Sequence, residues 1–213
     1  MTLTLHTAAR AAGPYRVRIA LNLKGVDYAP APVDLVASEQ HKAAYRSINP
    51  QKLLPALEGA GDPMTQSLAI IEWLEETHPE PPLLPKDPRE RATVRSMADI
   101  VACDIHPLNN LRVLRALEAM EVPEATRLTW AKRWIADGFG ALEQMVAKHG
   151  GGWAFGETPT MADCFLVPQV ANSQRFKVDL APYPHIAAVW ERSKDHPAFH
   201  AASYEQQPDY KPA

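Results

Sequence analysis

The chain has 213 residues, which is enough for one large domain or two small ones. Its composition is that of a globular protein, because 46% of the residues are hydrophobic and 22% are charged. Lys and Arg total 22 against 25 for Asp and Glu, so the net charge is −3. This balance offers no general attraction for a nucleic acid or an anionic membrane, and we expect neither as a partner.

Before residue 79, three segments have the short, β-rich pattern of strands. They are residues 3–7, 28–35 and 54–57. We expect a fourth strand after residues 54–57, and we expect the third and fourth strands to form a hairpin. Helical patterns lie between and after the strands, so this part of the chain is predicted to be mixed α/β.

Three helices are expected in this part. Residues 16–24 have one apolar side and are followed by Gly25, a typical helix C-cap. Residues 39–47 predict a short second helix, and Ser67 is a good N-cap for a third helix over residues 68–77. Two parallel strands joined by a helix, then a hairpin and a closing helix, form the thioredoxin-like arrangement.

Prolines separate this part from the rest of the chain. The sequence has 20 prolines, about 9% of the residues against a usual 5% or so, and five of them fall between residues 79 and 88. Proline lacks a backbone donor and biases the preceding residue away from the α region, so no helix or central strand runs through this segment. We predict domains of residues 1–82 and 88–213.

The second domain is predicted to be all-α. Helical patterns cover residues 89–120, 123–148, 161–173 and 185–195. Thr160 and Asp163 have the spacing of a capping box, in which each side chain bonds the other residue's backbone N–H at a helix start.

The cysteines and the N-terminal residues indicate in which compartment the protein resides and whether it binds a metal through cysteine. Cys103 and Cys164 are too few and too far apart for a disulfide framework, a Cys-based zinc site or a C-x-x-C motif, which favours a reducing compartment. The first residues lack a signal-peptide pattern, and no stretch approaches 18 uninterrupted apolar residues. We expect a cytoplasmic protein without a metal.

This domain order resembles a soluble glutathione transferase, and five local strings resemble the zeta class of that family. The strings are residues 16–21 (RVRIAL), 49–51 (NPQ), 54–57 (LPAL), 66–76 (QSLAIIEWLEE) and 104–110 (DIHPLNN). The class includes maleylacetoacetate isomerase and glutathione-dependent maleylpyruvate isomerase. The resemblance implies a homodimer that uses glutathione for cis–trans isomerisation of a small unsaturated diacid. The alternatives are a general glutathione transferase or peroxidase, and a glutathione-binding protein without isomerase activity.

The resemblance assigns five glutathione contacts to the first domain. Leu54 would pair its backbone with the cysteinyl residue of glutathione, beside a cis Pro55. Gln66 and Ser67, at a helix start, would bind the γ-glutamyl carboxylate, and Gln51 would hold glutathione from the preceding loop. Without the resemblance, the same residues indicate only a turn, a helix cap and a surface glutamine.

Two further glutathione contacts are implied in the second domain. His106 and Asn110 have i, i+4 spacing, so on one continuous helix they would share a face. Pro107 between them removes the bond to the carbonyl of Cys103, which predicts a kink. A lone helical histidine is more often structural, so the role of His106 depends on the resemblance.

Three arginines match positions that bind substrate carboxylates in the maleylpyruvate branch of the class: Arg10, Arg112 and Arg175. A guanidinium pairs with a carboxylate through two parallel hydrogen bonds, which suits a diacid. The implied reaction adds the glutathione thiolate to the cis double bond, allows rotation, and eliminates the thiolate from the trans isomer. The arginines would stabilise the negative charge that develops.

One segment departs from the class. Zeta enzymes typically carry Ser-Ser-Cys or a Ser/Thr variant after the arginine that is Arg10 here, whereas this chain has Ala11, Ala12 and Gly13. Either the backbone N–H groups of Ala12 and Gly13, with the field of Arg10, activate the thiol, or isomerase activity is lost. Tyr15 is a third candidate for the thiol's hydrogen-bond donor.

Overall fold

The computed structural model describes residues 2–212. The chain forms two compact units, one of residues 1–83 together with 194–213 and the other of residues 84–193. The predicted second domain of residues 88–213 differs from this division in its last twenty residues. Each unit is described in turn.

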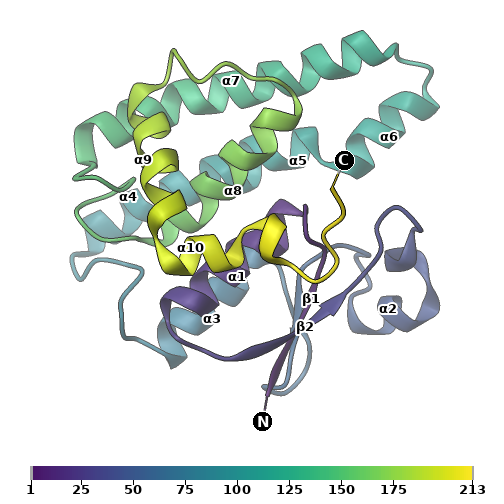
Figure 1. Cartoon of the computed structure of the whole chain (residues 1–213), viewed down its shortest axis with the longest axis horizontal. Helices are drawn as coiled ribbons and strands as arrows, with labels where there is room; N and C mark the ends of the chain where they lie inside the picture. The colour runs from purple at the N-terminus through teal and green to yellow at the C-terminus, as the bar shows by residue number, and fades with distance from the viewer. Residues whose placement is uncertain (1, 213) are drawn as a thin grey trace. The chain divides into compact units, whose positions relative to one another are not determined.

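The first unit contains a four-stranded sheet in the order β2-β1-β3-β4 (Figure 1). Its strands are β1 (Leu3–Thr7), β2 (Tyr28–Pro32), β3 (Ala56–Glu58) and β4 (Met64–Thr65). Strand β1 is parallel to β2 and antiparallel to β3, and β3 and β4 form the predicted hairpin. Strand β2 tolerates Pro30 and Pro32 because it lies at the sheet edge, where one side of the strand needs no ladder hydrogen bonds.

Three helices complete the thioredoxin-like arrangement, which confirms the predicted fold. They are α1 (Ala12–Leu23), α2 (Ala43–Ile48), which follows the short 3₁₀ turn η1 (Glu39–His41), and α3 (Ser67–Thr77). The core comes from the apolar faces that the patterns predicted, with Leu5, Val17 and Ile70 fully buried. Helix α1 ends before Gly25, whose φ of 62° is the left-handed conformation of a typical glycine C-cap.

The last residues of the chain return to the first unit. Helix α10 (Pro197–Ala202) and the 3₁₀ turn η3 (Tyr204–Gln206) were not predicted, and α10 lies beside α1 (Figure 1). Arg18 on α1 makes this attachment, because its Nε donates to the carbonyl of Ala202 at 2.9 Å. Asn22 Nδ2 also donates to the carbonyl of Ala198 at 3.0 Å, and residues 194–213 group with the first unit.

Arg18 is fully buried and is satisfied by several acceptors. Besides Ala202, its guanidinium donates to Thr7 Oγ1 at 2.8 Å and to the carbonyl of Ala9 at 3.0 Å. Burial lowers the pKa of Arg18 to about 10, so it remains charged at neutral pH. One buried cation thus joins α1, the end of β1 and α10.

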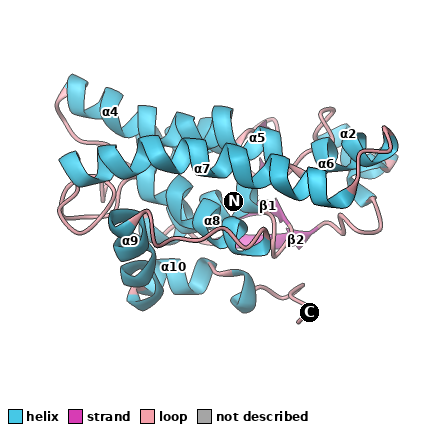
Figure 2. Ribbon diagram, turned by 90° about the horizontal axis from the view of Figure 1, so that it is seen from above, coloured by secondary structure: helices cyan, strands magenta, loops and turns pink. Residues whose placement is uncertain are grey.

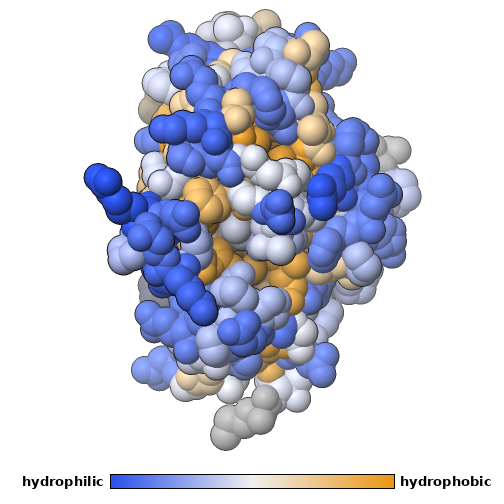
Figure 3. All heavy atoms as spheres, turned by 90° about the vertical axis from the view of Figure 1, so that its left-hand side faces the viewer, coloured by the Kyte–Doolittle hydropathy of each residue, from blue (hydrophilic) through white to orange (hydrophobic). Residues whose placement is uncertain are grey.

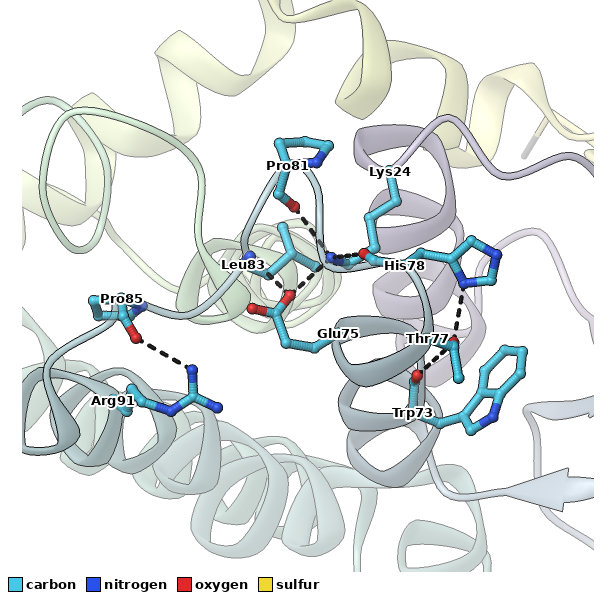
Figure 4. A network of polar contacts seen from close by, with 9 residues as sticks. All are labelled: Lys24, Trp73, Glu75, Thr77, His78, Pro81, Leu83, Pro85 and Arg91. Atoms are coloured by element: carbon cyan, nitrogen blue, oxygen red, sulfur yellow. Dashed lines mark hydrogen bonds and ion pairs between the residues drawn. The ribbon is translucent and has the colours of Figure 1, made fainter.

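The proline-rich segment is held to the first unit by a second buried cation, Lys24, which directly follows α1 (Figure 4). Lys24 Nζ donates to Glu75 Oε2 and to the carbonyl of His78, both at 2.7 Å, and to the carbonyl of Pro81 at 3.1 Å. Glu75 Oε2 also accepts from the Leu83 N–H at 2.9 Å. The segment is therefore anchored as far as Leu83, where the chain leaves the first unit.

The second unit is helical, as predicted. Its helices are α4 (Pro88–Asp99), the π-helical stretch η2 (Ile100–Ile105), α5 (His106–Asn109), α6 (Leu111–Ala119), α7 (Glu124–His149), α8 (Met161–Arg175) and α9 (Pro184–Asp195). Helix α7 lies along η2, α5 and α6 (Figure 2). Within residues 84–193, β pairing is limited to one bridge between Gly150 and Gly156.

The single helix predicted over residues 89–120 is wrong. The chain passes through η2 just before Pro107, and Asn110 leaves the helical conformation with ψ of 146°. Pro107 cannot donate to the carbonyl of Cys103, and the Asn110 side chain starts α6 by accepting from the Arg112 N–H at 3.0 Å. His106 and Asn110 consequently do not share one continuous helix face.

The capping box at the start of α8 is confirmed. Asp163 is fully buried and its carboxylate accepts from the Thr160 N–H at 2.8 Å and the Ala154 N–H at 2.7 Å. Burial raises the pKa of Asp163 to about 6, although these hydrogen bonds act to lower it. The same carboxylate thus caps α8 and fixes the loop before it.

The surface is mostly hydrophilic on the face drawn in Figure 3, where apolar residues appear as patches between polar ones. Val36 and Met120 are among the few large hydrophobic side chains that are strongly exposed. Within residues 2–212, no helix is long and apolar enough to cross a membrane.

Replacing Lys24 by Met should lower the free energy of unfolding by about 3–5 kcal/mol, because the buried Glu75 carboxylate loses its cation. Urea unfolding measures this change. The matched control is Lys42→Met, which removes an exposed ion pair with Glu39 and should change stability little. Equal losses of unfolding free energy in the two variants would show that the buried ion pair stabilises the fold no more than the exposed one.

Candidate functional site

The first unit brings most of its predicted site residues together at three chain segments. These are the start of α1, the loop before β3 and the start of α3. The sheet order places β3 directly beside β1, from which α1 follows, and α3 packs against α1. Each segment contributes backbone or side-chain groups suited to a peptide or an anion.

The start of α1 has unused backbone donors. Ala11 precedes the helix in an extended conformation and provides no side-chain cap. Among residues 2–212, no group accepts a hydrogen bond from the N–H of Ala12 or Gly13, and Pro14 has no N–H to offer. The positive end of α1 therefore presents two backbone donors and no hydroxyl or thiol.

Gly13 lies directly against the loop before β3. A Cβ built on Gly13 would be 2.8 Å from the carbonyl oxygen of Leu54 and 3.1 Å from Cδ of Pro55. The Leu54–Pro55 peptide bond is cis, as expected. Within the described part of the chain, neither the N–H nor the C=O of Leu54 has a hydrogen-bond partner, so both can pair with a peptide.

Gln51 and Gln66 are in contact, although they come from different loops. Gln66 Nε2 donates to Gln51 Oε1 at 2.7 Å. Gln66 has φ of 70° and ψ of 117°, a conformation that costs a residue other than glycine about 1–3 kcal/mol. Such a conformation persists where the surroundings require it, and it places Gln66 immediately before α3 and Ser67.

Arg16 lies beside these segments, although the sequence patterns did not single it out. Its side chain is 2% exposed, and its Nη1 donates to Ser67 Oγ at 3.3 Å. Arg16 is three positions after Gly13, so the two share a face of α1. That spacing was a usable signal, but a basic residue on a helix ordinarily indicates a solvent-exposed side. A buried guanidinium beside the positive end of α3 gives this place a positive charge that suits an anion.

Tyr15 lies on a different side of α1. It is two positions after Gly13, which is about 200° around the helix, and its ring lies under the Arg18 guanidinium at 5.1 Å. Its side chain is 5% exposed, and burial raises its pKa. This placement is evidence against Tyr15 as the hydrogen-bond donor to a thiol beside Gly13.

Arg10 is exposed in the loop between β1 and α1, where the end of the chain contacts it. Its guanidinium lies 5.3 Å from the ring centroid of Tyr204 and 5.2 Å from that of Tyr210. Its Nη2 donates to the carbonyl of Lys211 at 3.3 Å. No local pattern predicts these three contacts, because they join residues about 200 positions apart.

The other predicted residues belong to the second unit. His106 is the first residue of α5, and Asn110 is the N-cap of α6. Arg112 is exposed in the first turn of α6, and Arg175 is exposed at the end of α8. Their roles in binding remain predictions.

Comparison with known proteins identifies the family. The model described as "Glutathione S-transferase, N-terminal domain" matches residues 11–82, and the corresponding C-terminal domain model matches residues 108–205. A maleylpyruvate isomerase from a Ralstonia species is 47% identical over 97% of this chain and 99% of its own length. The chain belongs to the glutathione S-transferase family, in its zeta class.

Solved structures agree with this assignment. The holo structure of a maleylpyruvate isomerase described as a bacterial zeta-class transferase has a TM-score of 0.95 to this zeta-class chain. It is 46% identical and covers 98% of this chain and 100% of its own. A maleylacetoacetate isomerase from Anaeromyxobacter dehalogenans, with glutathione bound in its active site, has a TM-score of 0.89. It is 44% identical and covers 98% and 97% of the two chains.

Gly13→Ala should weaken glutathione binding more than tenfold and lower stability by about 1–3 kcal/mol. The added methyl group would meet the Leu54 carbonyl and the Pro55 ring, so the start of α1 must move away from the loop. Isothermal titration calorimetry and urea unfolding measure the two effects. The control is Gly140→Ala on α7, where an added methyl group meets no other atom within 4 Å. It should leave glutathione affinity unchanged and leave stability unchanged or slightly higher. Wild-type affinity in Gly13→Ala would contradict the assignment of this contact.

Proposed function

We propose that the protein is a glutathione-dependent cis–trans isomerase of a small unsaturated diacid, such as maleylpyruvate or maleylacetoacetate. The observation that carries this proposal is the near full-length likeness to a maleylpyruvate isomerase, at 47% identity. The arrangement at α1, β3 and α3 supports it, because it offers the groups that glutathione requires. We further propose that the protein acts as a homodimer in the cytoplasm.

The residues of the first unit fit glutathione group by group. The unpaired backbone of Leu54 is placed to bind the cysteinyl residue as an added strand would. Ser67 and Gln66, with the buried charge of Arg16 behind them, suit the γ-glutamyl carboxylate. Gln51 orients Gln66 and is available to the same ligand.

In the second unit, we propose that His106 and Asn110 contribute to glutathione binding. The break before α6 gives Asn110 a fixed orientation, since its side-chain oxygen accepts from the Arg112 N–H. Arg112 and Arg175 are proposed to bind substrate carboxylates, together with Arg10 from the first unit. Both are exposed, which a role in binding a diacid requires.

When bound, glutathione would supply a thiolate that adds reversibly to the cis double bond, so that rotation about the resulting single bond and elimination give the trans isomer. The N–H groups of Ala12 and Gly13 favour a negative sulfur at the positive end of α1. Arg10, two residues before Ala12, is proposed to add its positive charge. The arginines would hold the substrate carboxylates and stabilise charge that develops beside them.

Two alternatives remain distinct from this proposal. A general glutathione transferase or peroxidase would act on an electrophilic aromatic compound or a hydroperoxide and would have no need of three carboxylate-binding arginines. A glutathione-binding protein without isomerase activity is favoured by Ala11, Ala12 and Gly13, which provide no side-chain donor to the sulfur. Which substrates are turned over distinguishes the isomerase from a general transferase or peroxidase. Whether the thiol of bound glutathione is ionised distinguishes the isomerase from a protein that only binds glutathione.

The purified protein should convert maleylpyruvate or maleylacetoacetate to the fumaryl isomer when glutathione is present. Product formation is followed spectroscopically between pH 6 and 9. Arg112→Ala and Arg175→Ala should lower diacid turnover far more than glutathione affinity, because each removes a guanidinium that pairs with a substrate carboxylate. Absence of turnover above the glutathione background would refute the proposal, and equal losses in turnover and affinity would mean that these arginines do not bind substrate.

The thiol of bound glutathione should ionise at a lower pH than a free thiol, whose pKa is about 8.5. Ultraviolet absorbance of the thiolate, followed against pH in the complex, measures this shift. Arg10→Leu should raise the thiol pKa part of the way back, because it removes a cation and leaves the backbone donors in place. If the bound thiol titrates like free glutathione, the protein binds glutathione without activating it.

A further inference from the structure

The C-terminal segment of residues 204–211 contacts Arg10 through three residues, and nothing in the proposed function assigns this segment a task. The Arg10 guanidinium carbon is 5.3 and 5.2 Å from the ring centroids of Tyr204 and Tyr210. The two rings are 5.7 Å apart and inclined at 45°. Two aromatic faces therefore meet one cation, an arrangement that the family resemblance did not imply.

The segment is attached on both sides of this contact. Before it, the carbonyl of Ala202 accepts from buried Arg18. After it, Asp209 Oδ2 accepts from the Ala9 N–H at 2.8 Å, and the carbonyl of Lys211 accepts from Arg10 itself at 3.3 Å. The chain end thus runs along residues 9 and 10 as a fixed strap, beside α1 (Figure 1).

The chemistry of this contact leaves the guanidinium able to bind an anion. A guanidinium has five N–H donors that all lie in its plane, whereas a cation is attracted to the face of an aromatic ring. Within residues 2–212, Arg10 makes one hydrogen bond, to Lys211. Because the two ring centroids are only 5.7 Å apart, both rings lie on one side of the guanidinium. They restrict a long, exposed side chain there, while its remaining N–H donors stay available to a carboxylate.

We propose that Tyr204 and Tyr210 are positioning residues that hold Arg10 in the orientation in which it binds a carboxylate of the substrate. This inference rests on the proposed function only in taking Arg10 as a carboxylate-binding residue. The ring faces, rather than the phenol hydroxyls, supply the effect. A variant that keeps the rings should therefore keep the function, and one that keeps only apolar bulk should not.

The test uses malonate, an unreactive small diacid, and measures its Kd for the full-length, glutathione-loaded protein by calorimetry. The double variant Tyr204→Leu with Tyr210→Leu should bind malonate about tenfold more weakly, since each ring contributes roughly threefold. The matched Tyr204→Phe with Tyr210→Phe variant should stay within about twofold of wild type. Glutathione affinity and the urea unfolding midpoint are recorded for both variants.

The two leucine substitutions are also tested in a protein that carries Arg10→Leu. If the rings act through Arg10, adding both leucine substitutions to Arg10→Leu should cause no further loss of malonate affinity, whereas a general structural effect would add to it. The inference is overturned if the leucine variant binds like wild type, if the phenylalanine variant loses as much as the leucine variant, or if the losses add. It is also overturned if wild type binds no malonate.

The isomerase assay is run on the same preparations, so the two proposals fail separately. Malonate binding with the expected ring dependence, but no turnover of a cis diacid, would refute the isomerase proposal and leave the role of the tyrosines standing. Turnover with ring-independent malonate binding would do the reverse. Where both hold, the leucine variant should raise the KM for the diacid with kcat reduced less.

Discussion

The buried guanidinium of Arg18 is the interaction on which the first unit's site depends. It is fully buried, and its acceptors come from the end of β1, from the following loop and from α10. Removing it would leave these acceptors without donors in a place that water does not reach, which costs more than a surface contact gains. The same bonds fix residues 7–9, so they also determine where the loop carrying Arg10 begins.

Helix α1 and its C-cap residue carry three buried cations, and each binds a different segment of the chain. Arg16 donates to Ser67 at the start of α3, Arg18 to the C-terminal segment, and Lys24 to Glu75 and the proline-rich segment. Each is less than a tenth exposed. A buried cation must be paired or it destabilises the fold, so these three contacts specify orientation as well as contributing stability. Through them, one helix positions the start of α3, the Arg10 loop and the exit of the chain from the first unit.

Local patterns in the sequence were sufficient for the strands, most helices and the capping box of Thr160 and Asp163, because these depend on neighbouring residues. The cis Pro55 and the zeta-class fold followed from the resemblance. The buried role of Arg16 and Arg18 was not predictable from periodicity, since a basic residue on an amphipathic helix normally indicates the solvent side. The return of the last residues to α1 depends on contacts across about 180 residues, and no local pattern encodes them.

At Asn110, by contrast, a local signal correctly predicted a disturbance of the helix but not that the helix would end. Pro107 predicted a kink, and the structure has a π-helical stretch before it and a new helix after it. A missing donor frees only one carbonyl, which a kink accommodates. Asn110 adds a second signal, because its side chain caps a new helix more favourably than it continues an old one. Two weak signals three residues apart, Pro107 and Asn110, together end the helix.

The absence of a hydroxyl at residues 11–13 gives the contact between Gly13 and Leu54 a double role. With no side-chain donor, the groups left to favour a thiolate at the start of α1 are the N–H groups of Ala12 and Gly13. Their position is set by how closely Gly13 approaches the carbonyl of Leu54, and Leu54 is also the residue whose backbone is free to pair with the peptide. A side-chain donor can adjust by rotating, but a backbone donor cannot. Under the proposed function, holding the peptide and lowering the pKa of its thiol both depend on this one close contact between two backbone segments.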